Sequence, residues 1–187
     1  KLSRTTKEPQ RSLNLCLSSS DNHVKAAALY DVAADCYASI SEKHKDKYYA
    51  EAIRQLRKAY EILMPLLNGI EDSASKESAP IVLAVELFAK SATSIGEARC
   101  DRKDMTSAIQ CFMYSTELLH TAAAKRSDGA FYEKYRLSRR YMLLSRTFES
   151  NDNVRESCAA MTLAAWCTVE TNIRKAALDD SPGDSDG

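Results

Sequence analysis

The sequence predicts an all-α protein made of antiparallel helical hairpins stacked one on another. Its 187 residues include only five glycines and four prolines, the two residue types that interrupt helices most strongly. Apolar residues recur at intervals of three and four in one segment after another, which is the period of an amphipathic helix. Short polar turns separate these segments, so we expect consecutive helices to run antiparallel. A closed helical bundle is the alternative arrangement of the same helices.

The first 20 residues form a basic N-terminal segment, in which Pro9 can open a short helix as far as Leu17. Three serines and an aspartate follow at 18–21, and these residue types favour helix caps over helix interiors. We therefore expect the short helix to stop there. Asp21 or Asn22 can cap a second helix, which is predicted to run to about Ser41, so the folded domain is expected to start at position 21.

A lysine-rich turn, SEKHKDK at 41–47, then leads into the most clearly amphipathic segment of the chain. Pro65 is expected to bend or end this helix and Gly69 to close it. The apolar residues at helical spacing in this segment form its predicted buried face: Ala52, Ile53, Leu56, Ala59, Tyr60 and Leu63.

The middle of the chain is predicted to hold a loop and then a second pair of helices. Residues 69–78, GIEDSASKES, are the expected loop, and Pro80 suits the first turn of the long helix after it. The start of that helix, IVLAVELF at 81–88, is almost wholly apolar, so we expect it to be buried on several sides. Asp104 is the predicted cap of the next helix, which continues to about Arg126.

Two further helices are predicted, from about Ala130 to Glu149 and from Asn153 to Leu178. With the helices before them they make three hairpins, so residues 21–178 are expected to form one three-hairpin domain. Residues 179–187 have the sequence DDSPGDSDG, which is acidic and has nothing apolar to bury. We predict that this tail is disordered.

The middle hairpin carries small and large residues where two closely packed helices need them. Gly96 and Ala108 would let the two backbones approach, while Ile95 and Phe112 would fill the space beside that contact. In its Ile95-Gly96 pair, and in Ala108 three residues before Cys111-Phe112, this hairpin resembles a tetratricopeptide repeat. Arg99 stands where the repeat has an aromatic residue, and the closing proline of the repeat is missing.

The first and last hairpins carry variants of the same pattern. In the first these are Tyr30, Ala34, Tyr37, Ala52, Leu56 and Ala59, with about six extra residues in the turn, and in the last they are Tyr141, Leu144, Ser145, Phe148, Ser157, Met161 and Ala164. Equivalent residues lie further apart than the roughly 34 residues of the standard repeat. The helices are therefore expected to be longer than standard, as in the tetratricopeptide-like arrays of vesicle-fusion adaptors and separase-type regulators of chromosome cohesion. The resemblance implies a right-handed stack with a concave groove.

Composition excludes some classes of function. The 26 basic and 26 acidic residues give no net charge, which argues against a general binder of nucleic acid or anionic membranes. The six cysteines form no C-x-x-C pair, so we expect reduced thiols and a cytoplasmic or nuclear location. No apolar run approaches the roughly 18 to 20 residues that cross a bilayer, so no membrane span is expected.

Sequence motifs give no support for catalysis. The chain has no glycine-rich phosphate loop, no nucleophile elbow and no convincing pairing of cysteine with histidine. Glu117 and His120 form one Glu-x-x-His motif, but a di-iron bundle needs two. We therefore expect no catalytic residues, no metal and no cofactor. The alternative, a helical-bundle enzyme that binds a small molecule or a metal, would need polar residues that converge inside the core. Trp166, among small residues, is expected in the core.

The resemblance implies a non-catalytic module that binds a peptide or helix of a partner protein, as a scaffold or adaptor within a larger protein or complex. The basic clamp that holds acidic chaperone tails is absent, and Asp31, Asp35 and Glu97 on the expected concave face would repel an acidic partner.

Basic residues gather later in the chain, where Arg136, Arg139 and Arg140 are predicted to share a helix face. An acidic or phosphorylated segment could bind there, although a solvated helix face gives the same pattern. The candidate partner-binding residues are Lys90, Arg136, Arg139, Arg140 and Arg146. The apolar segment 81–88 is the alternative surface, and the oligomeric state stays open.

Overall fold

The structure is a computed structural model that describes residues 7–38, 40–73, 75–125 and 130–179. This part of the chain is all-α, as predicted, with seven helices and no strand. The helices are α1 (Lys7–Tyr37), α2 (Glu42–Asn68), α3 (Ala79–Asp101), α4 (Met105–Ala124), α5 (Ala130–Lys134), α6 (Leu137–Glu149) and α7 (Val154–Asp179). Nearly all of the predicted disordered tail lies outside the described residues.

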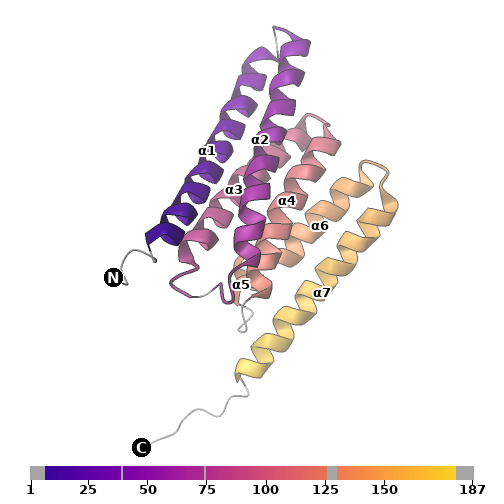
Figure 1. Cartoon of the computed structure of the whole chain (residues 1–187). Coiled ribbons are helices and arrows are strands. Elements are labelled where there is room, and N and C mark those ends of the chain that lie inside the picture. Colours follow the sequence, from indigo (N-terminus) through magenta and orange to yellow (C-terminus); the bar gives the residue numbers. More distant parts are fainter. Residues whose placement is uncertain (1–6, 39, 74, 126–129, 180–187) are drawn as a thin grey trace, which may run out of the picture.

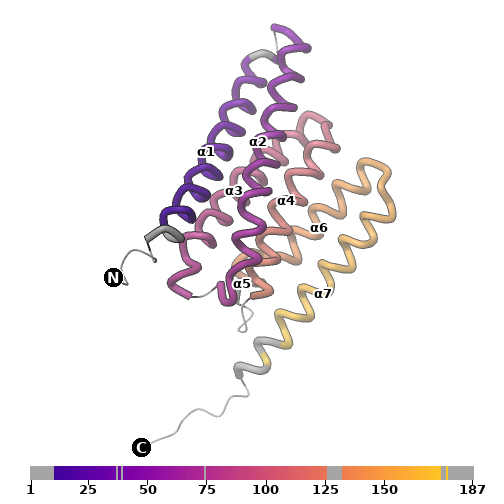
Figure 2. Tube along the Cα trace, viewed as in Figure 1, coloured from indigo at the N-terminus to yellow at the C-terminus, as the bar shows by residue number. Residues whose placement is uncertain are grey.

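Consecutive long helices pack against each other in pairs. The pairs are α1 with α2, α3 with α4, and α6 with α7, and they follow one another across the molecule in chain order (Figure 1; Figure 2). Between pairs, α1 packs on α3, α2 packs on α3 and α4, and α4 packs on α6. The short helix α5 lies against α4, α6 and α7. The α3–α4 pair therefore occupies the middle of the fold.

Several predicted helix ends are confirmed. Asp104 caps α4, and its carboxylate accepts a hydrogen bond from the backbone N–H of Ser107 at 3.2 Å. Pro80 lies in the first turn of α3, where the missing N–H of proline costs no hydrogen bond. Gly69 follows the last residue of α2. Pro65 does not end that helix, which continues for another turn to Asn68.

The predicted break at 18–21 is wrong, because α1 runs through it without interruption. The domain boundary placed after position 20 therefore lies inside a helix. Ser20 is fully buried, so it belongs to the apolar stripe of the helix and does not cap it. A salt bridge between Asp21 and Lys25, one turn apart, adds support on the solvent side. The stripe continues across the predicted break at the spacing of one helix face: Leu13, Leu17, Ser20, Val24 and Ala27.

The predicted lysine-rich turn at 41–47 is also wrong, since α2 already starts at Glu42. The backbone N–H of Lys45 donates to the carbonyl oxygen of Ser41, which closes the first turn of the helix. Lysine and glutamate are good helix formers, and Glu42 and Lys45 form an ion pair one turn apart. The connection between α1 and α2 is therefore short, and the six extra residues assigned to the turn belong to the helix.

The helix predicted from Ala130 to Glu149 is divided into α5 and α6. Arg136 marks the division, because its φ of 50° lies in the left-handed region and interrupts the helical path. Tyr132 and Tyr135 before this bend and Leu137 after it are all buried. The bend therefore accompanies burial of apolar residues on both sides of it.

The close contact predicted in the middle hairpin is confirmed. A Cβ atom added to Gly96 would lie only 2.6 Å from Cε1 of Phe112, so only glycine fits there without a shift of that ring. Ala108 is fully buried on the facing helix. At the corresponding position of the last hairpin the Oγ atoms of Ser145 and Ser157 lie 2.9 Å apart, which joins α6 to α7.

A buried arginine joins the first hairpin to the second. Arg99 on α3 is fully buried, and its Nη2 donates to Asp31 on α1. Its guanidinium lies over the ring of Tyr49 on α2, with Cζ 3.3 Å from the ring centre. The Tyr49 hydroxyl donates to Asp35 at 3.0 Å, and Asp35 also pairs with Arg102. The position at which the resembled repeat has an aromatic residue therefore holds an ionic contact between hairpins.

The helix α3 is more apolar than the sequence prediction allowed. By length and composition alone it is long and apolar enough to cross a membrane. In the structure its buried residues include Val85, Phe88 and Arg99, and it packs against α1, α2 and α4. These contacts are those of an interior helix. The alternative binding surface at 81–88 is mostly covered by them, since Leu83 and Leu87 are its exposed large side chains.

Candidate functional site

Two hollows flank α3 on the same side of the molecule. The first lies between α1 and α3 and has a volume of about 490 Å³. The second lies between α3 and the start of α6 and has a volume of about 450 Å³. Lys90 and Ser94 line both hollows, so they form one surface that we call the α3 groove. Its polar and charged lining residues are Asp21, Lys25, Asp31, Glu86, Lys90, Ser91, Thr93, Ser94, Glu97, Lys134, Tyr135 and Arg140.

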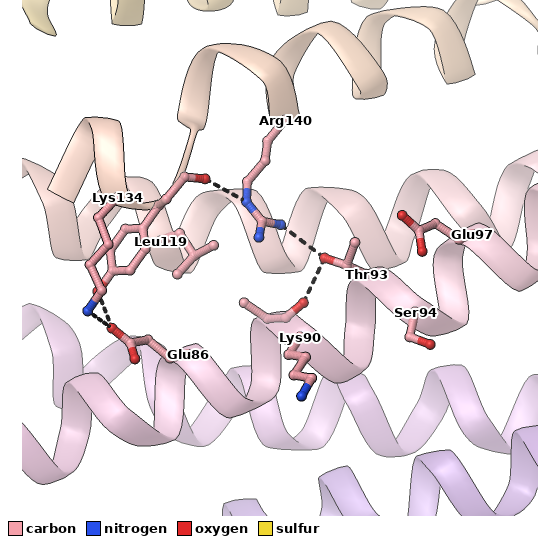
Figure 3. Close-up of a pocket in the computed structure, with 10 residues that line it drawn as sticks. Glu86, Lys90, Thr93, Ser94, Glu97, Leu119, Lys134 and Arg140 are labelled. Atoms are coloured by element: carbon pink, nitrogen blue, oxygen red, sulfur yellow. Dashed lines mark hydrogen bonds and ion pairs between the residues drawn. The ribbon is translucent and has the colours of Figure 1, made fainter.

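Arg140 is held over the second hollow by two neutral acceptors. Its Nε donates to the carbonyl oxygen of Tyr135 at 2.9 Å, and its Nη1 donates to the hydroxyl oxygen of Thr93 at 3.0 Å (Figure 3). The Thr93 hydroxyl donates in turn to the carbonyl oxygen of Ala89 at 2.7 Å. These bonds fix the guanidinium between α3 and the bend that precedes α6. Burial lowers the pKa of Arg140, and the nearby charge of Glu97 acts in the opposite direction.

The other charges of this hollow differ in how they are compensated. Glu86 accepts from the Lys134 ammonium and from the Tyr135 hydroxyl, the latter at 2.9 Å, so its charge is already balanced. Lys90 is exposed and forms no ion pair with the residues that the structure describes. Figure 3 shows its side chain pointing away from Arg140, which places its ammonium towards the α1 side of the groove.

The structure separates the predicted basic residues. Lys90 and Arg140 line the α3 groove, whereas Arg136 and Arg139 line a different hollow of about 560 Å³ that faces α7. Arg146 is exposed further along α6 and lines none of these hollows. The prediction that the three arginines at 136, 139 and 140 share one helix face is therefore wrong. The left-handed bend puts Arg136 outside α6, and Arg140 turns towards α3.

The acidic residues expected to repel a partner are mostly compensated. Asp31 pairs with Arg99, and Asp35 pairs with Arg102. Desolvation raises the pKa of Asp31, while the charge of Arg99 lowers it. Sequence reasoning missed this compensation because the paired residues lie on different helices, about 70 positions apart for the first pair.

The opposite surface of the second hairpin carries an aromatic cluster. Nδ1 of His120 lies 2.6 Å from the hydroxyl of Tyr141, and the rings of Tyr132 and Trp166 also contact the imidazole. Burial lowers the pKa of His120. Glu117 of the same motif points elsewhere and accepts from the Tyr60 hydroxyl at 2.7 Å. Trp166 is 44% exposed, contrary to the prediction of a core residue.

The groups with metal-binding or nucleophilic chemistry are dispersed. Among the described residues, no three histidine, cysteine, aspartate or glutamate side chains come close enough to hold a metal ion. All six cysteines are free thiols. Burial raises the pKa of Cys111 to about 12 and that of Cys167 to about 11, so both thiols stay protonated near neutral pH. Neither thiol is therefore activated as a nucleophile.

Comparison of the chain with protein-family models, curated proteins and solved structures gives no significant match.

Proposed function

We propose that this chain is a non-catalytic protein-interaction module that binds a peptide or helix of a partner protein along the α3 groove. The observation that carries the proposal is the continuity of the groove, since Lys90 and Ser94 line the hollows on both sides of α3. A surface that crosses the first helices of consecutive hairpins fits an elongated ligand better than a compact one.

The arrangement of the hairpins supports a tetratricopeptide-like array. The pairs Ala34 with Ala52, Gly96 with Ala108, and Ser145 with Ser157 occupy equivalent positions, and all six are small and buried. The substantial contacts between hairpins join neighbours, which favours an open stack over a closed bundle. In such a stack the first helix of each hairpin contributes to one common face. Here α1, α3 and α6 contribute to the α3 groove.

The chemistry of the groove favours a protein ligand. It mixes basic and acidic residues with apolar ones such as Val24, Leu87 and Leu119, as a surface for a peptide does. A nucleic acid would need a strongly basic stripe, and Asp21, Glu86 and Glu97 interrupt any such stripe. The free cysteines fit a reducing compartment, so the cytoplasm or nucleus is the proposed location.

A peptide selection tests the proposal. The chain is immobilised and a random peptide library displayed on phage is selected against it, after which the enriched peptides are synthesised. Ser94→Trp would fill the shared centre of the groove, and we expect it to weaken binding at least about tenfold. Thr162→Trp is the matched control, because Thr162 is exposed on α7 and lines neither hollow. Peptides that bind both variants as tightly as the parent would place the binding surface elsewhere.

A further inference from the structure

Arg140 is a partly buried cation without an anionic partner. Both of its hydrogen-bond acceptors, the Tyr135 carbonyl and the Thr93 hydroxyl, are neutral. Among the described residues Arg140 forms no ion pair. The charge of Glu97 acts on its pKa, but the two side chains are not in contact as a salt bridge. Guanidinium carries five N–H donors, and the ones on Nη2 are not used by these two bonds. Donors therefore remain for a ligand in the hollow that Arg140 lines.

Comparison with the buried Arg99 shows which partner Arg140 lacks. Arg99 is also removed from water, but Asp31 supplies a carboxylate in direct contact. Arginine is rarely buried without such a partner, because removing a charge from water costs several kcal/mol unless an opposite charge or good hydrogen bonds offset it. The second hollow has room for this partner, at about 450 Å³.

We propose that Arg140 is the anchor of the α3 groove and binds the carboxylate of an Asp or Glu side chain of the partner. This inference rests on the proposed function, and it specifies the chemical group of the partner that binds at one position in the groove. A carboxylate fits the fork of donors that the guanidinium presents. It also brings a single negative charge, which matches the single charge of the partly buried guanidinium; Lys90, the other unpaired cation that lines the hollow, is exposed and points away from Arg140 (Figure 3).

A phosphate group fits this hollow less well. It carries a charge of about −1.5 to −2 near neutral pH. Glu97 lines the hollow and would repel the second charge. Lys134 is already paired with Glu86, and Lys90 points away from Arg140 (Figure 3), so neither lysine is placed to balance that charge. The site therefore selects a carboxylate over a phosphate.

The test uses propionate, a singly charged analogue of the glutamate side chain, with inorganic phosphate as the competing probe. The full chain is labelled with ¹⁵N-arginine, and the Nε–H resonance of Arg140 is followed while sodium propionate replaces sodium chloride at constant ionic strength. We expect a saturable shift of that resonance at millimolar propionate, with phosphate at least about threefold weaker. Assignment comes from the resonance that disappears in Arg140→Met.

Variants separate binding by Arg140 from general effects of charge. Arg140→Met is expected to weaken propionate binding about tenfold or more; because this variant has lost the reporting resonance, its binding is measured by calorimetry. Arg139→Met is the matched control, since Arg139 is exposed and lines the other hollow, and it leaves affinity unchanged. Glu97→Gln removes a repulsive charge and is expected to raise the affinity about twofold to fivefold. This variant keeps Arg140, so it tests the site even if Arg140→Met fails to fold.

Each outcome decides for or against the inference. No saturable shift up to about 50 mM propionate, equal binding by Arg140→Met, or phosphate binding tighter than propionate would overturn it. The proposed function can fail separately. Peptides that bind the α3 groove without regard to Arg140 would leave the function standing and remove the anchor. Propionate binding at Arg140 without any peptide that is sensitive to Ser94→Trp would leave the anchor standing and remove the function.

Discussion

Substitution of Gly96 by alanine tests the closest contact in the fold. The added Cβ would lie 2.6 Å from Cε1 and 3.0 Å from Cδ1 of Phe112, whose ring is buried and has little room to move. Overpacking of this kind costs about 1 to 3 kcal/mol of unfolding free energy. Alanine is a better helix former than glycine by about 1 kcal/mol, which offsets part of that cost. We therefore expect a net loss of about 1 kcal/mol, measured by urea denaturation with circular dichroism.

Gly69 offers a matched control for this substitution. Its φ of −76° is available to any residue, and an added Cβ would meet only carbonyl oxygens at 3.4 and 3.5 Å. Gly69→Ala is therefore expected to be neutral or stabilising by up to about 1 kcal/mol. In a Phe112→Leu background the clash disappears, and Gly96→Ala is expected to become stabilising. If Gly96→Ala stabilises the parent as much as it stabilises the Phe112→Leu protein, the packing argument is wrong.

Three further substitutions test the core, the ionic contact and the aromatic cluster. Ala108→Leu places a larger side chain in a fully buried position and is expected to cost about 1 to 3 kcal/mol in the same denaturation assay. Asp31→Asn leaves a fully buried guanidinium without its carboxylate and is expected to cost about 3 kcal/mol. Asp35→Asn breaks a partly exposed pair and is expected to cost about 1 kcal/mol or less, so equal losses would contradict the assignment. The folded-state pKa of His120 lies below its unfolded value near 6.5, so its contribution to stability is present above that pH and is lost as the pH falls below it. His120→Gln is expected to flatten the fall in melting temperature between about pH 7 and pH 5.5, and a fall as steep as that of the parent would contradict this reasoning.

Local chemistry and periodicity were sufficient to predict most of the helices. Asp104 and Pro80 act at helix starts through their own side-chain and backbone chemistry, so a single sequence reveals them. Gly69 follows α2 as predicted, although its φ of −76° is available to any residue. The wrong break at 18–21 shows the limit of that reasoning. Three serines and an aspartate favour a cap locally, but Ser20 lies on the buried stripe of α1, and packing against α2 overrides the local preference.

The candidate site could be predicted only in part. The sequence identifies Lys90 and Arg140 as basic residues on helices, but it places Arg140 with Arg136 and Arg139. Their separation depends on one left-handed residue, Arg136, and no glycine or asparagine marks that bend. The two acceptors of Arg140 come from α3 and from the end of α5, and their approach depends on tertiary packing.

The exposure of α7 shows why the same repeat pattern can mean burial in one hairpin and exposure in another. Aligned on Ala52, Ala108 and Ser157, the residues four positions later are Leu56, Phe112 and Met161. Leu56 and Phe112 are buried on helices against which the following hairpin packs, and Phe112 also packs against Gly96 of its own hairpin, whereas Met161 is 47% exposed. Among the described residues no hairpin follows α7, and apolar residues of this helix such as Val169 and Ile173 stay exposed. Trp166 is 44% exposed although its ring contacts His120 and Tyr132. Periodicity therefore identifies which residues form the face between hairpins, but burial of that face depends on a neighbouring hairpin that the pattern of one helix does not specify.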